Sequence, residues 1–216
     1  WYVVDSRQSM YFEQVFRASH KSGLVREDVV LNHYGFGTMN GKDGKPFKTR
    51  DGGVMRLEYL VSGVNEKMLE KIKANQESKN DLSMSEEEAV ETAKTIALAA
   101  IKYGDLSNQA SKDYIFDIDR FTSFEGDTGP YVLYTMVRIK SILAKYEETF
   151  GKAEGEIAHP YGGEAEERTY GAAEIDLMLT AAKFNDVVAK TYEELAPHKL
   201  CQYIYEMANA FNSFYH

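Results

Sequence analysis

The chain has 216 residues, with 25 Lys and Arg against 34 Asp and Glu and a formal net charge of -9 at pH 7. Its hydrophobic content of 44% excludes a disordered chain, and no run approaches the roughly 20 apolar residues of a membrane-spanning helix. The acidic total disfavours a protein whose whole surface binds DNA or RNA, but it leaves room for a local basic site. A single cysteine rules out an internal disulfide, which favours the cytoplasm, although a periplasmic protein without disulfides would look the same.

The first residues predict part of an α/β sheet. Tyr2–Val4 has the apolar run of a buried strand, Gln8–Lys21 has helical periodicity, and Val29–Tyr34 is a second β-rich run. This strand, helix, strand order is typical of an α/β fold. Because the first strand starts with no leading loop, we expect the chain to begin inside a fold and to be a fragment.

After about Val54 the apolar residues recur at helical spacing. Ser85 and Glu88 form the sequence pattern of a capping box, and Asp127 or Thr128 is expected to cap a helix that starts at Gly129-Pro130. The expected helices are one from Leu57, one over Ala89–Tyr103 closed by Gly104, one from Pro130 to Gly151, one over Ala173–Leu195 and one from Pro197.

The strongest chemical signal is the loop from Lys42 to Arg56. It holds five basic and two acidic residues and follows a cluster of glycines, inside a chain that is acidic overall. A flexible glycine backbone with several ammonium groups suits a triphosphate, because the backbone allows close approach and the charges face the phosphate oxygens. The spacing is not that of a P-loop. On composition alone, a solvated surface hairpin with scattered lysines is the more common structure.

Three blocks in order resemble bacterial-type arginyl-tRNA synthetases. In the block His33–Arg50, the pentapeptide Lys45-Pro-Phe-Lys-Thr49 stands where the family has its degenerate KMSKS signature. The block Asp113–Tyr131 resembles the family run D-Y-x-F-D-x-D-R…S-F-E-G-x-T-G-P-Y, and Leu195–His216 is similar to a helix of its anticodon-binding domain. Together the blocks span most of the chain.

The resemblance implies a mainly α fold, in which the C-terminal piece of a Rossmann-like α/β catalytic domain precedes an α-helical anticodon-binding bundle. The catalytic piece would cover residues 1–60, connecting helices 61–112 and a truncated bundle 113–216. The implied activity of the parent enzyme is ATP-dependent ligation of arginine to its tRNA. ATP, L-arginine and arginine tRNA would be its partners, Mg²⁺ would accompany ATP, and no protein-bound metal or membrane is expected.

The resemblance is incomplete, because no two of the five histidines have the spacing of the H-I-G-H signature. We therefore expect the isolated chain to be inactive. The alternative is a non-catalytic tRNA- or protein-binding helical module that keeps a synthetase-like sequence.

By the same resemblance, Lys45 and Lys48 would stabilise charge on the pyrophosphate leaving group, and Thr49 would shape the loop. Gln8 matches a family position that contacts arginine, and it follows a strand at the carboxyl edge of the sheet, where open α/β folds bind ligands. A solvent-facing residue in the first turn of a helix is an equally good interpretation of Gln8.

His33, Gly35 and Gly37 fall where family members place backbone beside adenosine, and glycine permits close approach there.

The helix after Pro130 is the candidate RNA-binding element. Arg138 and Lys145 share a predicted polar face that could touch phosphates, opposite Val132, Met136, Ile139 and Leu143. Tyr131 and Tyr134 could stack on unpaired bases, but packing inside the bundle is the interpretation we prefer for both.

Asp117, Asp119 and Glu125 lack the spacing of a calcium loop, so we expect structural roles, with Asp119 and Arg120 as a local charge pair. Cys201 lies beside the apolar side of a predicted helix and is expected to be a packed thiol.

Overall fold

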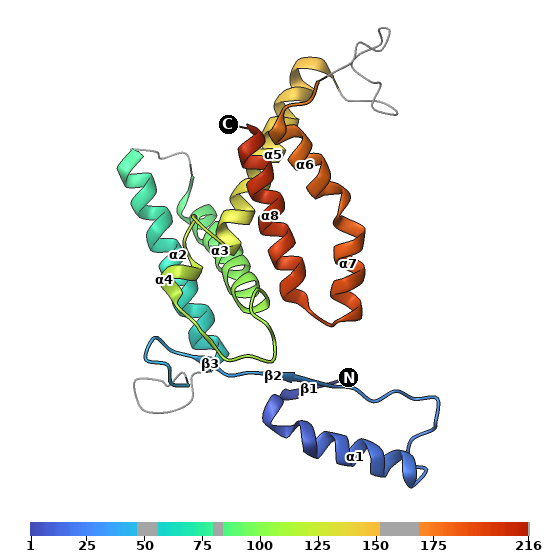
Figure 1. Ribbon diagram of the computed structural model, residues 1–216. Coiled ribbons are helices and arrows are strands. Elements are labelled where there is room, and N and C mark those ends of the chain that lie inside the picture. The colour runs from blue at the N-terminus through green and yellow to red at the C-terminus, as the bar shows by residue number, and fades with distance from the viewer. Residues whose placement is uncertain (47–55, 80–83, 152–168, 216) are drawn as a thin grey trace.

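Helices dominate the computed structural model, which describes residues 1–46, 56–79, 84–151 and 169–215 (Figure 1). A short strand and helix unit at the N-terminus lies at one end of a set of longer helices. Over the described ranges, no helix combines the length and the apolar character that crossing a membrane would need.

The N-terminal unit is a parallel strand pair covered by one helix. It consists of β1 (Tyr2–Asp5), the 3-10 turn η1 (Ser6–Gln8), α1 (Ser9–Lys21) and β2 (His33–Phe36). Tyr2 pairs with His33, and Asp5 pairs with Phe36. Aromatic side chains on one side of α1 contact the rings of β1 and β2. The predicted order of strand, helix and strand is confirmed.

The predicted start of the second strand is wrong. Pairing begins at His33 instead of Val29, because β1 offers only four residues as partners. Val30 lies outside the strand and is 76% exposed. The helix also starts one residue later than predicted, since Gln8 closes the 3-10 turn.

The next unit joins a second parallel strand pair to two long helices. β3 (Met39–Asn40) pairs with β4 (Tyr114–Ile115), and the helices are α2 (Leu57–Lys79), α3 (Glu86–Leu106) and the short α4 (Ile118–Phe121). Figure 1 shows α2 and α3 side by side, and these two helices share the most extensive packing in the described fold.

The main hydrophobic core lies between α2, α3 and the segment around α4. Alanine side chains on α3 let the larger residues of α2 approach closely, and two phenylalanine rings close the end at α4. The buried residues of this core are Leu60, Val64, Met68, Ala93, Ala97, Ala100, Phe116 and Phe121.

The start of α3 follows its sequence signal, but its end does not. The Glu88 N–H donates to Ser85 Oγ at 3.2 Å, and the Ser85 N–H donates to the Glu88 carboxylate at 2.9 Å, so the predicted capping box is confirmed. Gly104 does not end the helix, which continues to Leu106. A Cβ at Gly104 would lie 2.7 Å from the Phe121 ring, so the glycine makes room for that ring.

The C-terminal unit is a bundle of α5 (Gly129–Phe150), α6 (Ala172–Ala182), α7 (Phe184–Glu193) and α8 (Pro197–Tyr215). The Tyr131 N–H donates to Thr128 Oγ1 at 3.2 Å, which confirms the predicted cap of α5. The predicted end at Gly151, where φ is 81°, and the start of α8 at Pro197 are also confirmed.

The single helix predicted over Ala173–Leu195 is wrong, because the chain bends at Lys183 into α6 and α7. At the bend, the Lys183 N–H donates to the Thr180 carbonyl at 3.2 Å, which is a tighter turn than an α-helix makes. Both α6 and α7 pack against α8, so the bend lets the two segments follow one long helix.

Candidate functional site

Lys45 lies at the end of a tight hairpin that follows β3 directly. The Gly41 N–H donates to the Lys45 carbonyl at 2.8 Å, and the Lys45 N–H donates to Asp43 Oδ1 at 3.1 Å. Asn40 and Pro46 form an antiparallel bridge that closes the hairpin. The Lys45 residue is exposed, so its ammonium is open to a ligand. The other two predicted loop residues, Lys48 and Thr49, lie outside the described residues.

The segment that leads into this hairpin is attached to the helical part of the protein. The Thr38 N–H donates to Asp113 Oδ1 at 2.6 Å, and the Tyr114 N–H donates back to the Thr38 carbonyl at 3.1 Å. The Phe116 N–H donates to the Asn40 carbonyl at 2.8 Å. The run Asp113–Phe116 therefore acts as a backbone strip that holds the strand before the hairpin.

Gly37 and Gly35 are placed against the chain's own backbone. A Cβ at Gly37 would press on the Lys112 carbonyl and lie 2.7 Å from the Asp113 nitrogen. A Cβ at Gly35 would lie 3.0 Å from the Ser6 Cα. Both positions therefore have a structural reason for glycine, and the predicted contact of each with adenosine stays a prediction.

His33 and Gln8 both belong to the N-terminal unit. The His33 ring is half-buried and stacks on Phe12 with a centroid distance of 5.0 Å and an interplanar angle of 6°. Its Nε2 is buried and has no hydrogen-bond partner among the described residues. Gln8 is exposed at the end of η1, which packs beside β2 at the carboxyl end of the strand pair. The structure thus places Gln8 and Gly35 at the same edge, where ligands of open α/β sheets bind.

A guanidinium beside that edge keeps one carboxylate ionised. Arg7 Nη2 donates to Asp5 Oδ2 at 2.6 Å, at the end of β1. Hydrogen bonds from the side chain and backbone of Arg7 lower the pKa of Asp5 to about 2. The edge near Gln8 therefore carries a fixed negative charge with a cation already paired to it.

An ion-pair cluster that the sequence did not predict joins the hairpin to the helices. Lys42 Nζ lies 3.0 Å from Asp117 Oδ1 and 3.2 Å from Asp119 Oδ2, and Lys67 Nζ lies 3.4 Å from Asp119 Oδ1. The predicted local pair of Asp119 with Arg120 is wrong, since Asp119 binds these two lysines. A basic loop and the acid-rich run after Asp113 were the only signals in the sequence for this contact.

The charges in the cluster support one another. Hydrogen bonds to Asp117 and then Asp119 raise the pKa of Lys42. The pKa of Asp119 is lowered, chiefly by hydrogen bonds from Lys42 and Lys67. Burial alone would raise the pKa of Asp117, but Lys42 and two backbone N–H groups outweigh it and lower that pKa. A cavity of about 410 Å³ opens beside the cluster, between the hairpin, α2 and α4.

Arg138 is engaged inside the bundle. Its Nη1 donates to Asn212 Oδ1 at 2.7 Å and its Nη2 donates to the Tyr134 hydroxyl at 2.9 Å. Its guanidinium carbon also lies 4.8 Å from the centre of the Tyr134 ring and 5.4 Å from that of Tyr215. Arg138 is therefore half-buried and held toward α8, while Lys145 is exposed.

The predicted faces of α5 are only partly right, since Val132 and Ile139 are half-buried as expected but the other two apolar residues are not. Met136 and Leu143 are 45% and 57% exposed, whereas Thr135 is buried toward α8. The reason is that Asn212 of α8 accepts from Arg138 and donates to Thr135, which turns this side of α5 toward α8. The packed interpretation of Tyr131 is confirmed, because its hydroxyl donates to Asn209 Oδ1 at 2.8 Å and its ring packs in the bundle.

Cys201 is a packed thiol, as predicted. It is 6% exposed on α8, and burial raises the pKa of the thiol to about 11. Within the described ranges, no three His, Cys, Asp or Glu side chains are grouped so that they could hold a metal ion.

Comparison with known proteins assigns both parts of the chain. Residues 1–118 match the family model of tRNA synthetases class I (R), catalytic domain, and residues 132–216 match the DALR anticodon binding domain. The arginine–tRNA ligase of Agathobacter rectalis is 62% identical over 217 residues, which cover 100% of this chain and 35% of the relative. That of Alkaliphilus oremlandii is 47% identical over 215 residues, covering 100% of this chain and 34% of the relative.

Solved structures agree with these relatives. The arginyl-tRNA synthetase of Plasmodium falciparum has a TM-score of 0.71 at 25% identity and covers 99% of this chain and 34% of that chain. That of Thermus thermophilus has a TM-score of 0.71 at 29% identity, and the match covers 99% of this chain and 32% of that chain. The chain therefore spans about a third of the length of the relatives it matches.

The predicted fold class is confirmed: a mainly helical chain joins a piece of a class I catalytic domain to an anticodon-binding bundle. The match over residues 1–118 extends through α2 and α3 as far as α4. On these matches, the chain belongs to the class I arginyl-tRNA synthetase family.

Proposed function

We propose that this chain is part of an arginine–tRNA ligase that activates arginine with ATP and transfers it to tRNA in the cytoplasm. The observation that carries the proposal is the joint match of a class I (R) catalytic domain and a DALR domain in one chain, together with 62% identity to a named arginine–tRNA ligase. Within the chain we assign residues 1–60 to the catalytic domain, 61–112 to connecting helices and 113–216 to the anticodon-binding bundle.

In this proposal the hairpin delivers positive charge to the leaving group of the first reaction step. The carboxylate of arginine attacks the α-phosphate of ATP, and pyrophosphate leaves as arginyl-adenylate forms. The exposed ammonium of Lys45, with that of Lys48, stabilises the charge that develops on pyrophosphate. Mg²⁺ arrives with ATP as part of the substrate, and Thr49 shapes the loop.

The N-terminal unit binds the other parts of the substrates. Gln8, which is exposed at the carboxyl end of the strand pair, contacts arginine. His33, Gly35 and Gly37 line the side toward adenosine. The buried and unpartnered Nε2 of His33 supports this placement, because a buried ring nitrogen without a partner is costly unless a ligand or water satisfies it.

The bundle binds tRNA in this proposal, through Arg138 and Lys145 on α5. Arg138 uses one bond from each of its terminal nitrogens for Asn212 and Tyr134. A guanidinium has five N–H donors, so a phosphate can still accept from the remaining ones. The intramolecular bonds then hold the guanidinium in place for the phosphate.

The test is arginine-dependent exchange of pyrophosphate into ATP, measured in the presence of tRNA with the full-length protein that contains this chain. We expect exchange with arginine and none with lysine. Lys45→Ala is expected to lower kcat about 100-fold, the usual effect of removing a group that stabilises transition-state charge. The 216-residue chain alone is expected to show no exchange.

A full-length protein that binds tRNA but gives no exchange with arginine would overturn the enzymatic proposal. It would support the alternative, a non-catalytic tRNA-binding helical module.

A further inference from the structure

We propose that Lys42 is a positioning residue, which orients the hairpin of residues 41–46 by binding Asp117 and Asp119 so that Lys45 meets the pyrophosphate in one geometry. The inference rests on the proposed ligase function. It gives Lys42 a role in the chemistry of the loop, and it explains why the Asp113–Tyr131 block carries Asp117 and Asp119.

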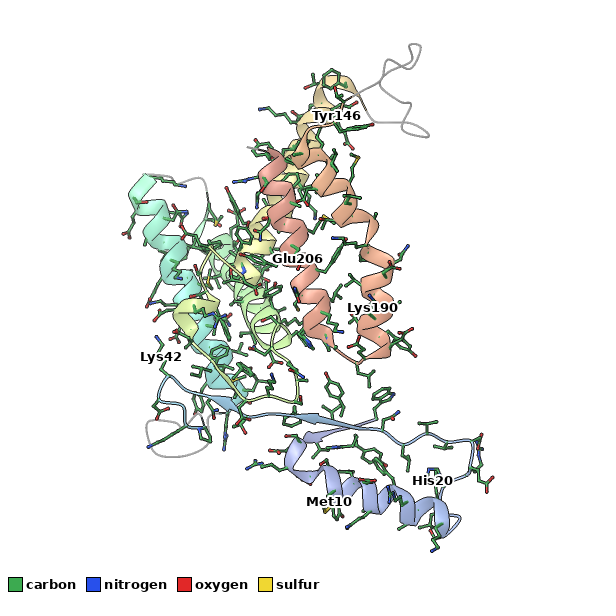
Figure 2. The ribbon with its side chains drawn as sticks, in the orientation of Figure 1. Met10, His20, Lys42, Tyr146, Lys190 and Glu206 are labelled. Carbon is green, nitrogen blue, oxygen red and sulfur yellow. The ribbon has the colours of Figure 1, made fainter. Side chains whose placement is uncertain are left out.

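Lys42 is the side-chain link between the hairpin and the helices. Its ammonium lies 3.0 Å from Asp117 and 3.2 Å from Asp119, three positions before Lys45 in the sequence. Figure 2 shows Lys42 on the edge of the hairpin nearest α2 and α4. The backbone of the preceding strand is fixed by the Asp113–Phe116 strip, so Lys42 fixes the tip that the strip does not reach.

The two carboxylates lie at the start of a short helix that is held at both ends. Asp117 caps α4, since its Oδ1 accepts from the backbone N–H of Asp119 at 3.0 Å and of Arg120 at 3.4 Å. At the other end of α4, Lys71 Nζ donates to the Thr122 carbonyl at 2.8 Å and to its Oγ1 at 2.9 Å. Because both ends of α4 are held, the carboxylates have a fixed position relative to the core between α2 and α3.

The geometry favours positioning over direct contact with ATP. The Lys42 ammonium points at two carboxylates, and Lys67 adds a second cation to Asp119. With two cations facing two carboxylates, the cluster is neutral overall and has little attraction for a phosphate. Lys45, in contrast, is exposed and follows the hairpin turn, on the strand opposite Gly41. Lys42 therefore acts on the reaction through the hairpin.

The ion pairs of Lys42 contribute little to the stability of the fold. Lys42 is 62% exposed at its side chain, and exposed ion pairs contribute little to the free energy of unfolding. Loss of the pair is therefore expected to leave the thermal midpoint unchanged while the hairpin samples more orientations. Since catalysis needs reacting groups within a narrow geometry, a small change of orientation lowers the rate.

The experiment is a double-mutant cycle in the full-length protein. Lys42→Ala, Asp117→Asn with Asp119→Asn, and the three changes combined are compared in arginine-dependent exchange of pyrophosphate into ATP. Asn is chosen because it still caps a helix. We expect each of the first two proteins to lose about 10-fold in kcat with an unchanged KM for tRNA, and the combined protein to lose no more than either. Lys42→Arg is expected to keep most of the rate.

The matched control is Lys73→Ala. Lys73 forms an ion pair with Glu86 at 2.9 Å and is 46% exposed, but it lies on α2 away from the hairpin. We expect its kcat to equal that of the unchanged protein.

A second readout does not need activity. Amide hydrogen exchange at Gly41, whose N–H donates to the Lys45 carbonyl, is measured in the full-length protein. We expect faster exchange in Lys42→Ala and in the double Asn variant, and no change in Lys73→Ala.

The outcomes separate this proposal from the proposed function. If the unchanged full-length protein does not exchange pyrophosphate into ATP, the proposed function is wrong. Amide hydrogen exchange at Gly41 then still tests whether Lys42 and the two carboxylates hold the hairpin. A loss of activity in Lys42→Ala that the double Asn variant does not share means that Lys42 touches the substrate, and it overturns the inference. Full activity in Lys42→Ala overturns it as well.

Discussion

The hydroxyl of Tyr34 donates a hydrogen bond of 2.9 Å to the carbonyl of Leu195, although the two residues are 161 positions apart. Tyr34 belongs to β2, and Leu195 lies in the turn between α7 and α8 with a φ of 51°. Burial, and then the charge of Asp105, raise the pKa of Tyr34, so the phenol keeps its proton further into the alkaline range. The bond joins the N-terminal sheet to the anticodon-binding bundle, beside a cavity of about 730 Å³ that both residues line.

Tyr34→Phe is expected to lower the free energy of unfolding by about 1 kcal/mol, because it leaves the Leu195 carbonyl without this donor. Urea unfolding of the 216-residue chain measures the change. Tyr59→Phe is the control, since Tyr59 is 61% exposed on α2. Equal midpoints for the two variants would show that the bond contributes nothing.

Gly37→Ala and Gly63→Ala are expected to change stability in opposite directions. At Gly37 the added methyl meets the backbone of Lys112 and Asp113, which cannot yield, so a loss of about 3 kcal/mol is expected. At Gly63, inside α2, the nearest atom to a Cβ is the Ile118 Cδ1 at 4.0 Å, so alanine fits. Alanine there should raise stability by about 1 kcal/mol. Urea unfolding of both variants gives the test. An unchanged stability of Gly37→Ala would mean that the backbone at Gly37 does not lie this close to Lys112 and Asp113.

Thr128→Ala is expected to cost about 2 kcal/mol of unfolding free energy, the upper end for a helix cap. The hydroxyl does two jobs, because it accepts from the Tyr131 N–H and donates to the Ser123 carbonyl at 2.6 Å. Thr128→Ser keeps the hydroxyl and should cost much less. Thermal unfolding followed by circular dichroism compares the two, and similar losses would assign the effect to the methyl group.

The Cys201 thiol is expected to react slowly with Ellman's reagent at pH 8 in the folded chain and quickly in urea, because burial raises its pKa to about 11. The folded state disfavours the thiolate, so this group costs nothing below its ordinary pKa and removes stability as the pH rises above it. Cys201→Ala should remove this contribution to the loss of stability at alkaline pH. Rapid reaction of the folded protein at pH 8 would contradict the assignment.

Local signals in the sequence predicted three helix ends correctly. Ser85, Thr128 and Gly151 act on their own turns of helix, so their effect is visible within a few residues. The bend at Lys183 was not visible, because it follows from the packing of two segments on α8. Propensity cannot report a bend that tertiary contacts impose.

The candidate site likewise has a residue that its local motif predicted and residues whose distant partners could not be predicted. Lys45 was found from its motif, and the structure gives it an exposed position on a hairpin. The partners of Lys42 were missed because Asp117 and Asp119 are more than 70 residues away and their acidic run has a local capping role as well. Arg138 looked solvent-facing because the polar residues on α8 that bind it could not be read from the periodicity of α5.

The Asp113–Phe116 strip also determines when, during synthesis of the chain, the strand before the hairpin can find its partner. Thr38 leaves the ribosome 75 residues ahead of its partner Asp113, a delay of roughly 4–15 s at ordinary rates of translation. Two-residue strands such as β3 and β4 are too short to pair stably by themselves, so β3 waits until α2 and α3 have formed and packed. We therefore expect the hairpin of residues 41–46 to reach its native place only after residue 116 has been synthesised, well after its own position in the chain.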